Sequence, residues 1–483
     1  MRPLLTGPLL LAAWLAVVTM ISTAGAESAG TDDLRREVEA LKKMLHDMQD
    51  RMRKQDELIR KLSAERAAPP TQPTPSAAST AAPPLVITAT PPPPPPAPAK
   101  EPWSPTQPIT LLSGSRGYMN ISFDALIDFG WSTTSDVKAL EIGDHDPNQR
   151  GFTLPHEEIL FDGAVDPYFK GVADIVFKLD ENNETEVELE EAYLTSTALP
   201  WNLQTKGGQY FTEFGRLNQQ HPHAWDFVDQ PLVNGRMFGP EGLRNPGARV
   251  SWLAPTPFYS ELFLSMQNSQ GTTAYSFRNS EDSLFGTTPL DRPVHDLGDM
   301  LYAPRYAASF DLTDSQTLVA GVSGAFGPND SGEATRTQIY GGDVYWKWKP
   351  ATQSGGFPFV SWQTEAMGRR YQAGAGPLED NPDVFVPTGT FYDWGMYSQV
   401  LYGFKQRWVA GTRFDWVTGQ HGEMRPDNNP DRFRFSPDLT FYPTEFSKLR
   451  LQYNYDHSQT RGSDSSVWMQ VEFLLGSHAA HKF

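Results

Sequence analysis

The stretch from residue 466 to residue 475 constrains the fold of this chain most strongly. Apolar and polar residues alternate along it, as they do along a strand whose two faces meet different surroundings. The apolar positions are Val467, Met469, Val471, Phe473 and Leu475, and the polar positions include Ser466, Gln470 and Glu472. Residues 119–129 show the same period of two. We therefore predict a strand near each end of one folded region, each with an apolar and a polar face.

Sixteen alternating segments follow one another along this region. They begin near Tyr118, Glu157, Tyr168, Glu186, Trp201, Gly247, Phe258, Leu301, Gln316, Thr335, Phe357, Tyr392, Gln406, Arg432, Lys448 and Ser466. Tight turns and generally long polar loops alternate between them, as expected when successive connections lie on opposite sides of a membrane. A closed barrel has no sheet edge, so every backbone N–H and C=O finds a partner and the barrel is able to span a bilayer. The predicted fold is all-β, a transmembrane antiparallel β-barrel of about 16 strands over residues 109–483.

Three segments precede the predicted barrel. Residues 1–26 combine a positive charge, a short apolar core and a small-residue cleavage site, which predicts a signal peptide and export. A membrane anchor is the alternative, but the apolar core is short for one. Residues 31–66 predict an α-helical coiled coil, and residues 67–108, rich in Pro and Ala, predict an extended linker.

The coiled-coil prediction rests on four heptads in residues 34–62. Both core positions are apolar except at Gln55, and charged residues occupy the flanking positions. The alternative is a single amphipathic helix, but so narrow an apolar stripe would then have nothing to pack against. We therefore expect the segment to self-associate.

The barrel pattern resembles that of bacterial outer-membrane porins of the 16-stranded type, over residues 117–483. The resemblance is carried by the alternating strands, the asymmetry between short turns and long loops, and the terminal Phe483, although the clean alternation already stops at Leu475. The coiled coil looks like the periplasmic extension of sucrose-type porins, and residues 190–214 loosely resemble phosphate-selective porins. The resemblance implies a Gram-negative outer-membrane location, contact with outer-membrane lipid, a periplasmic coiled coil and a homotrimer.

Sixteen strands leave a water-filled lumen, so the polar strand positions are expected to line a pore. The charged candidates are Asp124, Asp128, Glu186, Glu188, Glu190, Arg249, Glu261, Arg305, Asp343, Arg413, Arg432, Arg434 and Glu472. A wall bearing both signs can set up a transverse field across a constriction and favour polar solutes. The alternative for any single residue is that its side chain is only hydrated.

The charge balance indicates which solutes such a pore favours. Beyond residue 100 the chain carries 28 Lys and Arg against 48 Asp and Glu, a net charge of −20. A channel for phosphate would be expected to carry a net positive charge instead. The predicted function is therefore an outer-membrane porin for passive diffusion of small polar solutes, with a preference for cations or neutral solutes.

The long segment 211–246 is the expected constriction loop, because loops of this length are usually functional. Its charged candidates are Glu213, Arg216, Asp226, Asp229 and Arg236. His221 and His223 are weak candidates for metal ligands, since imidazole suits several transition metals. Pro222 between them and the lack of regular helical spacing argue against a site, so neither a metal nor a cofactor is predicted.

Other classes of function were weighed on motifs. The chain has neither a G-x-S-x-G nor an H-E-x-x-H motif, so no enzyme is predicted, and no nucleic-acid partner is expected. Two alternatives to a general porin remain. One is an envelope-tethering or adhesion barrel that contacts the cell wall through the coiled coil, and the other is a metal-uptake porin that uses the loop histidines.

Overall fold

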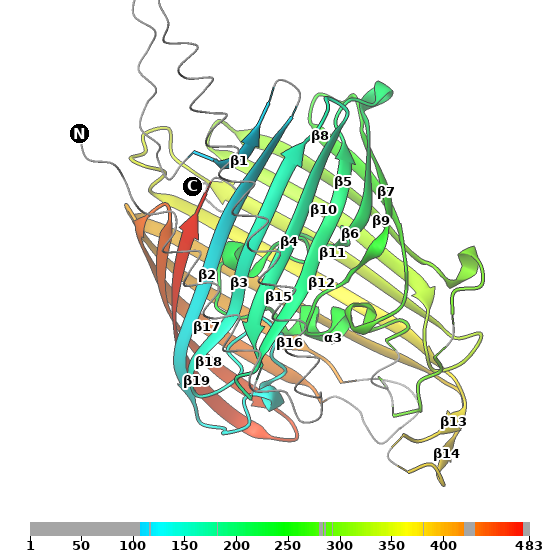
Figure 1. Cartoon of the computed structure of the whole chain (residues 1–483). Helices are drawn as coiled ribbons and strands as arrows, with labels where there is room; N and C mark the ends of the chain where they lie inside the picture. The colour runs from blue at the N-terminus through cyan, green and yellow to red at the C-terminus, as the bar shows by residue number, and fades with distance from the viewer. Residues whose placement is uncertain are drawn as a thin grey trace, which may run out of the picture. The chain divides into compact units, whose positions relative to one another are not determined.

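The computed structural model describes residues 107–114, 117–180, 182–279, 284, 286–291, 293–379, 381–419 and 430–476. The predicted signal peptide and coiled coil, nearly all of the linker and the terminal Phe483 lie outside these residues. Among the described residues, sixteen long strands form one antiparallel sheet (Figure 1).

The strands of the wall follow one another in chain order. They are β2 (Tyr118–Ser132), β3 (Gly151–Ala164), β4 (Phe169–Leu179), β5 (Thr185–Ser196), β6 (Leu203–Phe211), β7 (Arg244–Leu253), β8 (Tyr259–Gln267), β9 (Leu301–Thr313), β10 (Gln316–Pro328), β11 (Arg336–Trp348), β12 (Phe359–Ala373), β15 (Gly389–Lys405), β16 (Trp408–Val417), β17 (Arg432–Thr444), β18 (Ser447–Ser458) and β19 (Gly462–Leu475). Each strand pairs with its neighbours in the chain. The prediction of sixteen strands is confirmed, with β3 beginning well before the expected start at Glu157.

The first and last strands of the wall close the barrel. β19 pairs with β2, so that Met469 lies opposite Phe129 and Val471 lies opposite Ile127. A short strand that the sequence analysis did not predict, β1 (Ile109–Ser113), pairs with the beginning of β2, where Ile109 lies opposite Ile121. The pairing with β19 reaches only to Phe123, so β1 covers the part of β2 that β19 leaves open. The barrel therefore has no free edge along most of β2.

Several short helices and a small hairpin lie in the connections. The described helices are η1 (Lys138–Leu140), η2 (Pro200–Asn202), η3 (Pro222–Ala224), α3 (Leu232–Phe238), η4 (Thr272–Ala274) and η5 (Leu297–Asp299), and the hairpin pairs β13 (Gly376–Pro377) with β14 (Phe385–Val386). Within the described ranges, none of the helices combines the length and the apolar character that a membrane-crossing helix needs.

The side chains of the wall alternate between an apolar exterior and a polar interior. On β18, Leu449, Leu451 and Tyr453 are 41%, 52% and 39% exposed on the outside, whereas Arg450 and Gln452 between them are buried. The alternation places the charged residues of the strands in the lumen and leaves a belt of exposed apolar residues around the barrel. Such a belt is what a lipid-facing surface requires.

The outer belt gives a first testable prediction at Leu451. We expect Leu451→Arg to reduce the yield of folded barrel strongly, because a cation on the lipid face costs about 2–4 kcal/mol near the bilayer midplane. Leu451→Phe, at the same exposed position, should fold like the native chain. Urea titration of the barrel in liposomes measures the difference, and equal midpoints for the two variants would contradict the assignment of this face to lipid.

Candidate lumen site

The connection between β6 and β7, residues 212–243, packs against the inner wall of the barrel and is called the inner loop here. Its helix α3 contacts β12, β15 and β16. An apolar cluster holds the helix in place, and its members are Phe214, Leu232, Val233, Met237, Phe238, Leu243, Ala274, Phe277, Leu301, Ala325, Ile339, Met367, Tyr397 and Val417. All of these residues are buried, so the inner loop has a hydrophobic core of its own inside the barrel.

Two glycines of the wall make room for this core. A Cβ at Gly341 of β11 would lie 2.5 Å from the ring of Phe214, and a Cβ at Gly395 of β15 would lie 3.0 Å from the side chain of Val233. Real Cβ atoms do not tolerate the first distance. The absence of side chains at these two positions therefore allows the inner loop to approach the strands closely.

Asp229 ties the inner loop to the opposite wall. One carboxylate oxygen accepts hydrogen bonds from Arg413 Nη2 (2.8 Å) and Gln452 Nε2 (2.6 Å). The other accepts from Arg434 Nη1 (2.7 Å) and Asn454 Nδ2 (3.0 Å). Burial opposes the ionisation of this carboxyl, but Arg413 and Arg434 outweigh burial and hold the pKa of Asp229 below its usual range. Asp229 is thus a buried carboxylate bound by three strands, β16, β17 and β18.

A second tie joins the inner loop to the connection between β2 and β3, residues 133–150, called the first loop. The guanidinium of Arg236 forms two hydrogen bonds of 2.9 Å with Glu141 of the first loop. Arg432 donates to the carbonyl of Ala139 at 2.8 Å, and Arg434 donates to the carbonyl of Leu140 at the same distance. Both loops are therefore fixed to the basic side chains of β17.

The two sides of the lumen carry different charges. The basic residues on the lumen faces of β16, β17 and β18 are Arg413, Arg432, Arg434, Lys448 and Arg450. Acidic residues dominate β2, β3, β4 and β5, which β19 separates from β18 in the closed sheet, and they are Asp124, Asp128, Glu158, Asp174, Glu186, Glu188, Glu190 and Glu191. We call these two groups of strands the basic wall and the acidic wall, and the inner loop contacts the first through Asp229 and the second through His221.

Four histidines gather at the acidic wall. His156 comes from β3, His145 from the first loop, and His221 and His223 from the inner loop. We call them, together with the carboxylates Asp124, Glu158, Asp174, Glu190 and Glu191, the histidine cluster. Asp124, Asp174 and Glu190 are each no more than 1% exposed. The cluster thus joins the four strands β2 to β5, the first loop and the inner loop in a buried environment.

Two irregularities of strand pairing shape the cluster. In β5, Glu191 lies opposite Asp174 while Leu189 lies opposite Ile175, so Glu190 is an extra residue. The bulge buries Glu190 and Glu191 together, although they are neighbours in the chain. A similar shift in β3 lies between His156 and Thr153. A perfect alternation could not have placed so many carboxylates on one side.

His221 is the centre of the contacts in the cluster. Its Nδ1 lies 2.7 Å from Glu190 Oε2 and 3.1 Å from Asp174 Oδ2, and its Nε2 lies 3.1 Å from Glu191 Oε2. Burial opposes the charge on this imidazole, but Glu190, Asp174 and Glu191 outweigh it and raise the pKa of His221 well above its usual range. Protonated His221 would therefore be stabilised by three carboxylates.

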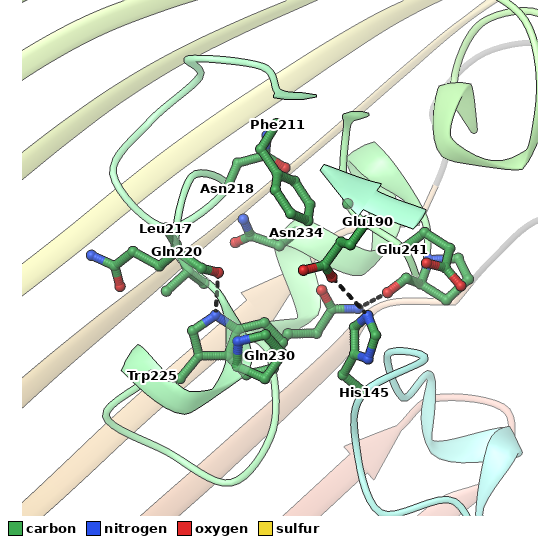
Figure 2. A pocket seen from close by; sticks show the side chains of 13 residues that line it. His145, Glu190, Phe211, Leu217, Asn218, Gln220, Trp225, Gln230, Asn234 and Glu241 are labelled. Carbon is green, nitrogen blue, oxygen red and sulfur yellow. Dashed lines mark hydrogen bonds and ion pairs between the residues drawn. The ribbon is translucent and has the colours of Figure 1, made fainter. Parts of the chain in front are cut away.

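The other histidines share the same carboxylates. His145 Nε2 lies 3.3 Å from Glu190 Oε1, and the two side chains point toward one another in Figure 2. His156 Nε2 lies 3.3 Å from Glu158 Oε2, and His223 Nδ1 lies 3.1 Å from the same oxygen. A small cavity of about 30 Å³ adjoins His145 and Glu190 and is lined by both loops.

A group of opposite charges lies next to the cluster. The amine of Lys178 contacts Asp144 and lies 2.8 Å from Glu241 and 3.4 Å from Glu188. A larger cavity of about 430 Å³ is lined by Asp144, Lys178 and Glu186 among others. Pro240 lines this cavity as well as the small one.

The remaining predicted site residues lie at several places in the lumen. Arg249 pairs with Glu213 of the inner loop at 2.6 Å, and Arg305 pairs with Asp343 at 2.6 Å. Glu472 pairs with Lys448.

Four further predicted residues make other contacts. Arg216 lies over the ring of Tyr345, and Asp226 accepts from Gln399 at 2.8 Å. Asp128 is buried in β2, and Glu261 accepts from Tyr259 at 2.7 Å. Two of these residues lie on the inner loop and two on the wall, and the four are not brought together in one site.

The sequence analysis did not select His145, His156, Glu158, Asp174 or Glu191. His156 and Glu158 are two residues apart and share a face of β3, but the expected strand began near Glu157 and left His156 out. His145 lies in a predicted loop, where sequence spacing says nothing about what it contacts. The signal that could have found the cluster is the coincidence of histidines in two long loops with carboxylates on neighbouring strands.

Comparison with solved structures finds outer-membrane proteins of low sequence identity. The outer-membrane channel DcaP of Acinetobacter baumannii is 13% identical, with a TM-score of 0.49, and the match covers 75% of this chain and 99% of that one. OprB of Pseudomonas putida is 10% identical, with a TM-score of 0.44, and the match covers 74% of this chain and 94% of that one. No family model matches the sequence.

The closed sheet of sixteen strands, with apolar residues outside and charged residues inside, defines a porin-type β-barrel. A protein of Aquifex aeolicus (strain VF5), described as uncharacterized, is 31% identical over 382 residues, which are 72% of this chain and 76% of that protein. The chain belongs to the same family as this protein.

Proposed function

We propose that this chain is an outer-membrane channel for small polar solutes that favours cations. The observation that carries the proposal is the separation of charge around the lumen wall, with carboxylates on β2 to β5 and guanidinium groups on β16 to β18, on the other side of β19. A solute that passes along these neighbouring walls of opposite charge meets a field directed across the pore axis, which favours molecules with charge or a dipole over apolar ones.

The direction of the selectivity follows from how the charges are paired. On the basic wall, Arg413 and Arg434 each bind the carboxylate of Asp229, so much of their charge is neutralised locally. On the acidic wall, Lys178 is shared by Asp144, Glu186, Glu188 and Glu241. The acidic wall therefore keeps the larger unbalanced charge, and cations are expected to follow it through the cavity beside Glu186.

The acidic wall gives a prediction on ion selectivity. We expect replacement of Glu186, Glu188 and Glu190 by Gln to lower the preference for cations, because it removes three negative charges from one strand. The measurement is the reversal potential of the channel in a planar bilayer with a KCl gradient, which should move toward zero.

A matched control removes three exposed acids that lie away from the lumen wall, as Asp314→Asn, Glu333→Gln and Asp383→Asn. This control should leave the reversal potential where it is. A native channel that prefers anions would overturn the proposal, and so would an equal shift in both triple variants.

The envelope-tethering alternative depends on residues 31–66 and 67–108. The coiled coil lies outside the described residues, and no contact among the described residues favours that alternative over a channel. Conductance of the purified chain in a planar bilayer separates the two, because a tether without a pore would carry no current.

A further inference from the structure

The histidine cluster contains more negative charge than its own residues need for ion pairing. Five carboxylates face four imidazoles, and among the described residues no lysine or arginine forms an ion pair with any of the five. Carboxylates with so little exposure are rarely left without a cation, because burial of an unpaired charge is costly. A bound cation would balance the excess.

The polar atoms of the cluster are close together but poorly arranged for hydrogen bonding with one another. Both carboxylate oxygens of Asp174 and of Glu190 are buried without a hydrogen-bond partner, and so is Nδ1 of His221, although Glu190 Oε2 lies only 2.7 Å from it. Asp174 and Glu190 are both fully buried. Single ligand atoms of Asp174, Glu190 and His221 all lie within 4.8 Å of one another, which is close enough to surround an ion.

The spacing of these atoms fits a transition metal. Around an ion with bonds of about 2.1 Å, tetrahedral ligands lie about 3.4 Å from one another. His156 Nε2 lies 3.3 Å from Glu158 Oε2, and His221 Nδ1 lies 3.6 Å from the same oxygen. These three residues, and likewise Asp174 with Glu190 and His221, offer ligand atoms that all lie within 4.8 Å of one another.

We propose that the histidine cluster binds one divalent first-row transition metal ion, with His156, Glu158 and His221 as its central ligands and Glu190 or Asp174 completing the coordination. Imidazole and carboxylate together suit Zn²⁺, Co²⁺ and related ions. His145 lies 3.4 Å from His156 through their Nδ1 atoms and is a further ligand within reach. The proposal concerns binding to the folded barrel and does not rest on the chain being a channel.

The ligands come from segments that meet only in the folded chain. Glu158 and His156 belong to the wall, whereas His221 belongs to the inner loop. A bound ion would therefore fasten the inner loop to the acidic wall, as Asp229 fastens it to the basic wall.

Cobalt titration of the mature, untagged chain in detergent tests the proposal. We expect saturable binding of Co²⁺ with a visible d–d absorption band and a stoichiometry of one, which Zn²⁺ displaces. In the variant His156→Ala/His221→Ala the affinity should fall by at least about tenfold, since the loss of even an outer-shell partner costs 10- to 100-fold.

Two controls keep the test decisive. The variant His295→Ala/His457→Ala removes the same number of histidines outside the cluster, where they contact Asp299 and Ser463, and should bind Co²⁺ like the native chain. Glu190→Gln keeps the size of the side chain and should weaken binding while the barrel still migrates as a heat-resistant folded band. The proposal is overturned if the folded native chain binds no Co²⁺ saturably, or if the His295/His457 variant loses the band while the His156/His221 variant keeps it.

Discussion

The variant Asp229→Ala is expected to raise the single-channel conductance several-fold, because the inner loop would obstruct the lumen less. The carboxylate of Asp229 accepts four hydrogen bonds from β16, β17 and β18, and each of its oxygens accepts two of them. Removal of one partner of a buried ion pair typically costs about 3–5 kcal/mol, because the other charge remains buried. The barrel wall is held by its own hydrogen-bonded sheet. The lost stabilisation should therefore affect the inner loop and let it move away from β17.

A neighbouring aspartate provides the control for this prediction. Asp226 lies on the same loop, but its carboxylate accepts one hydrogen bond, from Gln399 at 2.8 Å. Asp226→Ala removes the same group and should change the conductance much less. Conductance in planar bilayers at high salt, where surface charges are screened, compares the two variants directly. A native-like conductance for Asp229→Ala would show that this tie does not hold the loop.

The wall of the barrel could be predicted from the sequence because the alternation of apolar and polar residues shows which face of each strand points outward. The residues from Val467 to Phe473 alternate between a lipid-facing and a lumen-facing side, and a shift by one position would turn every apolar side chain inward. The strand at Ile109–Ser113 escaped because it is short and pairs with only the first residues of β2. The local sequence pattern therefore predicts the long strands, whereas a short strand such as β1 depends on tertiary contacts.

The interior of the barrel could be predicted only in part. The charged strand residues face the lumen as the alternation requires. Many of their partners come from loops, and loops have no repeating sequence pattern from which their course can be predicted. His221 was a weak metal candidate because Pro222 separates it from His223 without regular helical spacing, yet its neighbours in space are Glu190 of β5 and Asp174 of β4. The cluster also depends on the bulge at Glu190, which alternation by itself excludes. The composition of the site therefore depends on contacts between segments that are distant in the sequence.

The apolar core of the inner loop gives a second large expected effect, at Phe238. The ring of Phe238 packs edge-on against that of Phe214, with 4.9 Å between the ring centres, and both residues are fully buried. We expect Phe238→Ala to destabilise the seated inner loop by about 3–5 kcal/mol, because the truncation leaves a cavity in a packed core. The open-channel current should become noisier and the mean conductance should rise.

The two large-effect variants should differ in selectivity, and this difference tests how the inner loop is held. Phe238→Ala changes no charge, so the reversal potential in a KCl gradient should stay close to the native value. Asp229→Ala removes a negative charge and should shift the reversal potential toward anion selectivity.

Thiol labelling measures the movement of α3 directly. The native chain has no cysteine, so the rate at which a single Val233→Cys reacts with a water-soluble thiol reagent reports how exposed α3 becomes. That rate should rise in the Phe238→Ala background and stay low with Phe310→Ala, which truncates a ring on the outer face that is 37% exposed. Equal labelling rates in the two backgrounds would mean that the polar ties alone seat the loop, and that the hydrophobic core inside the barrel contributes little to closing it.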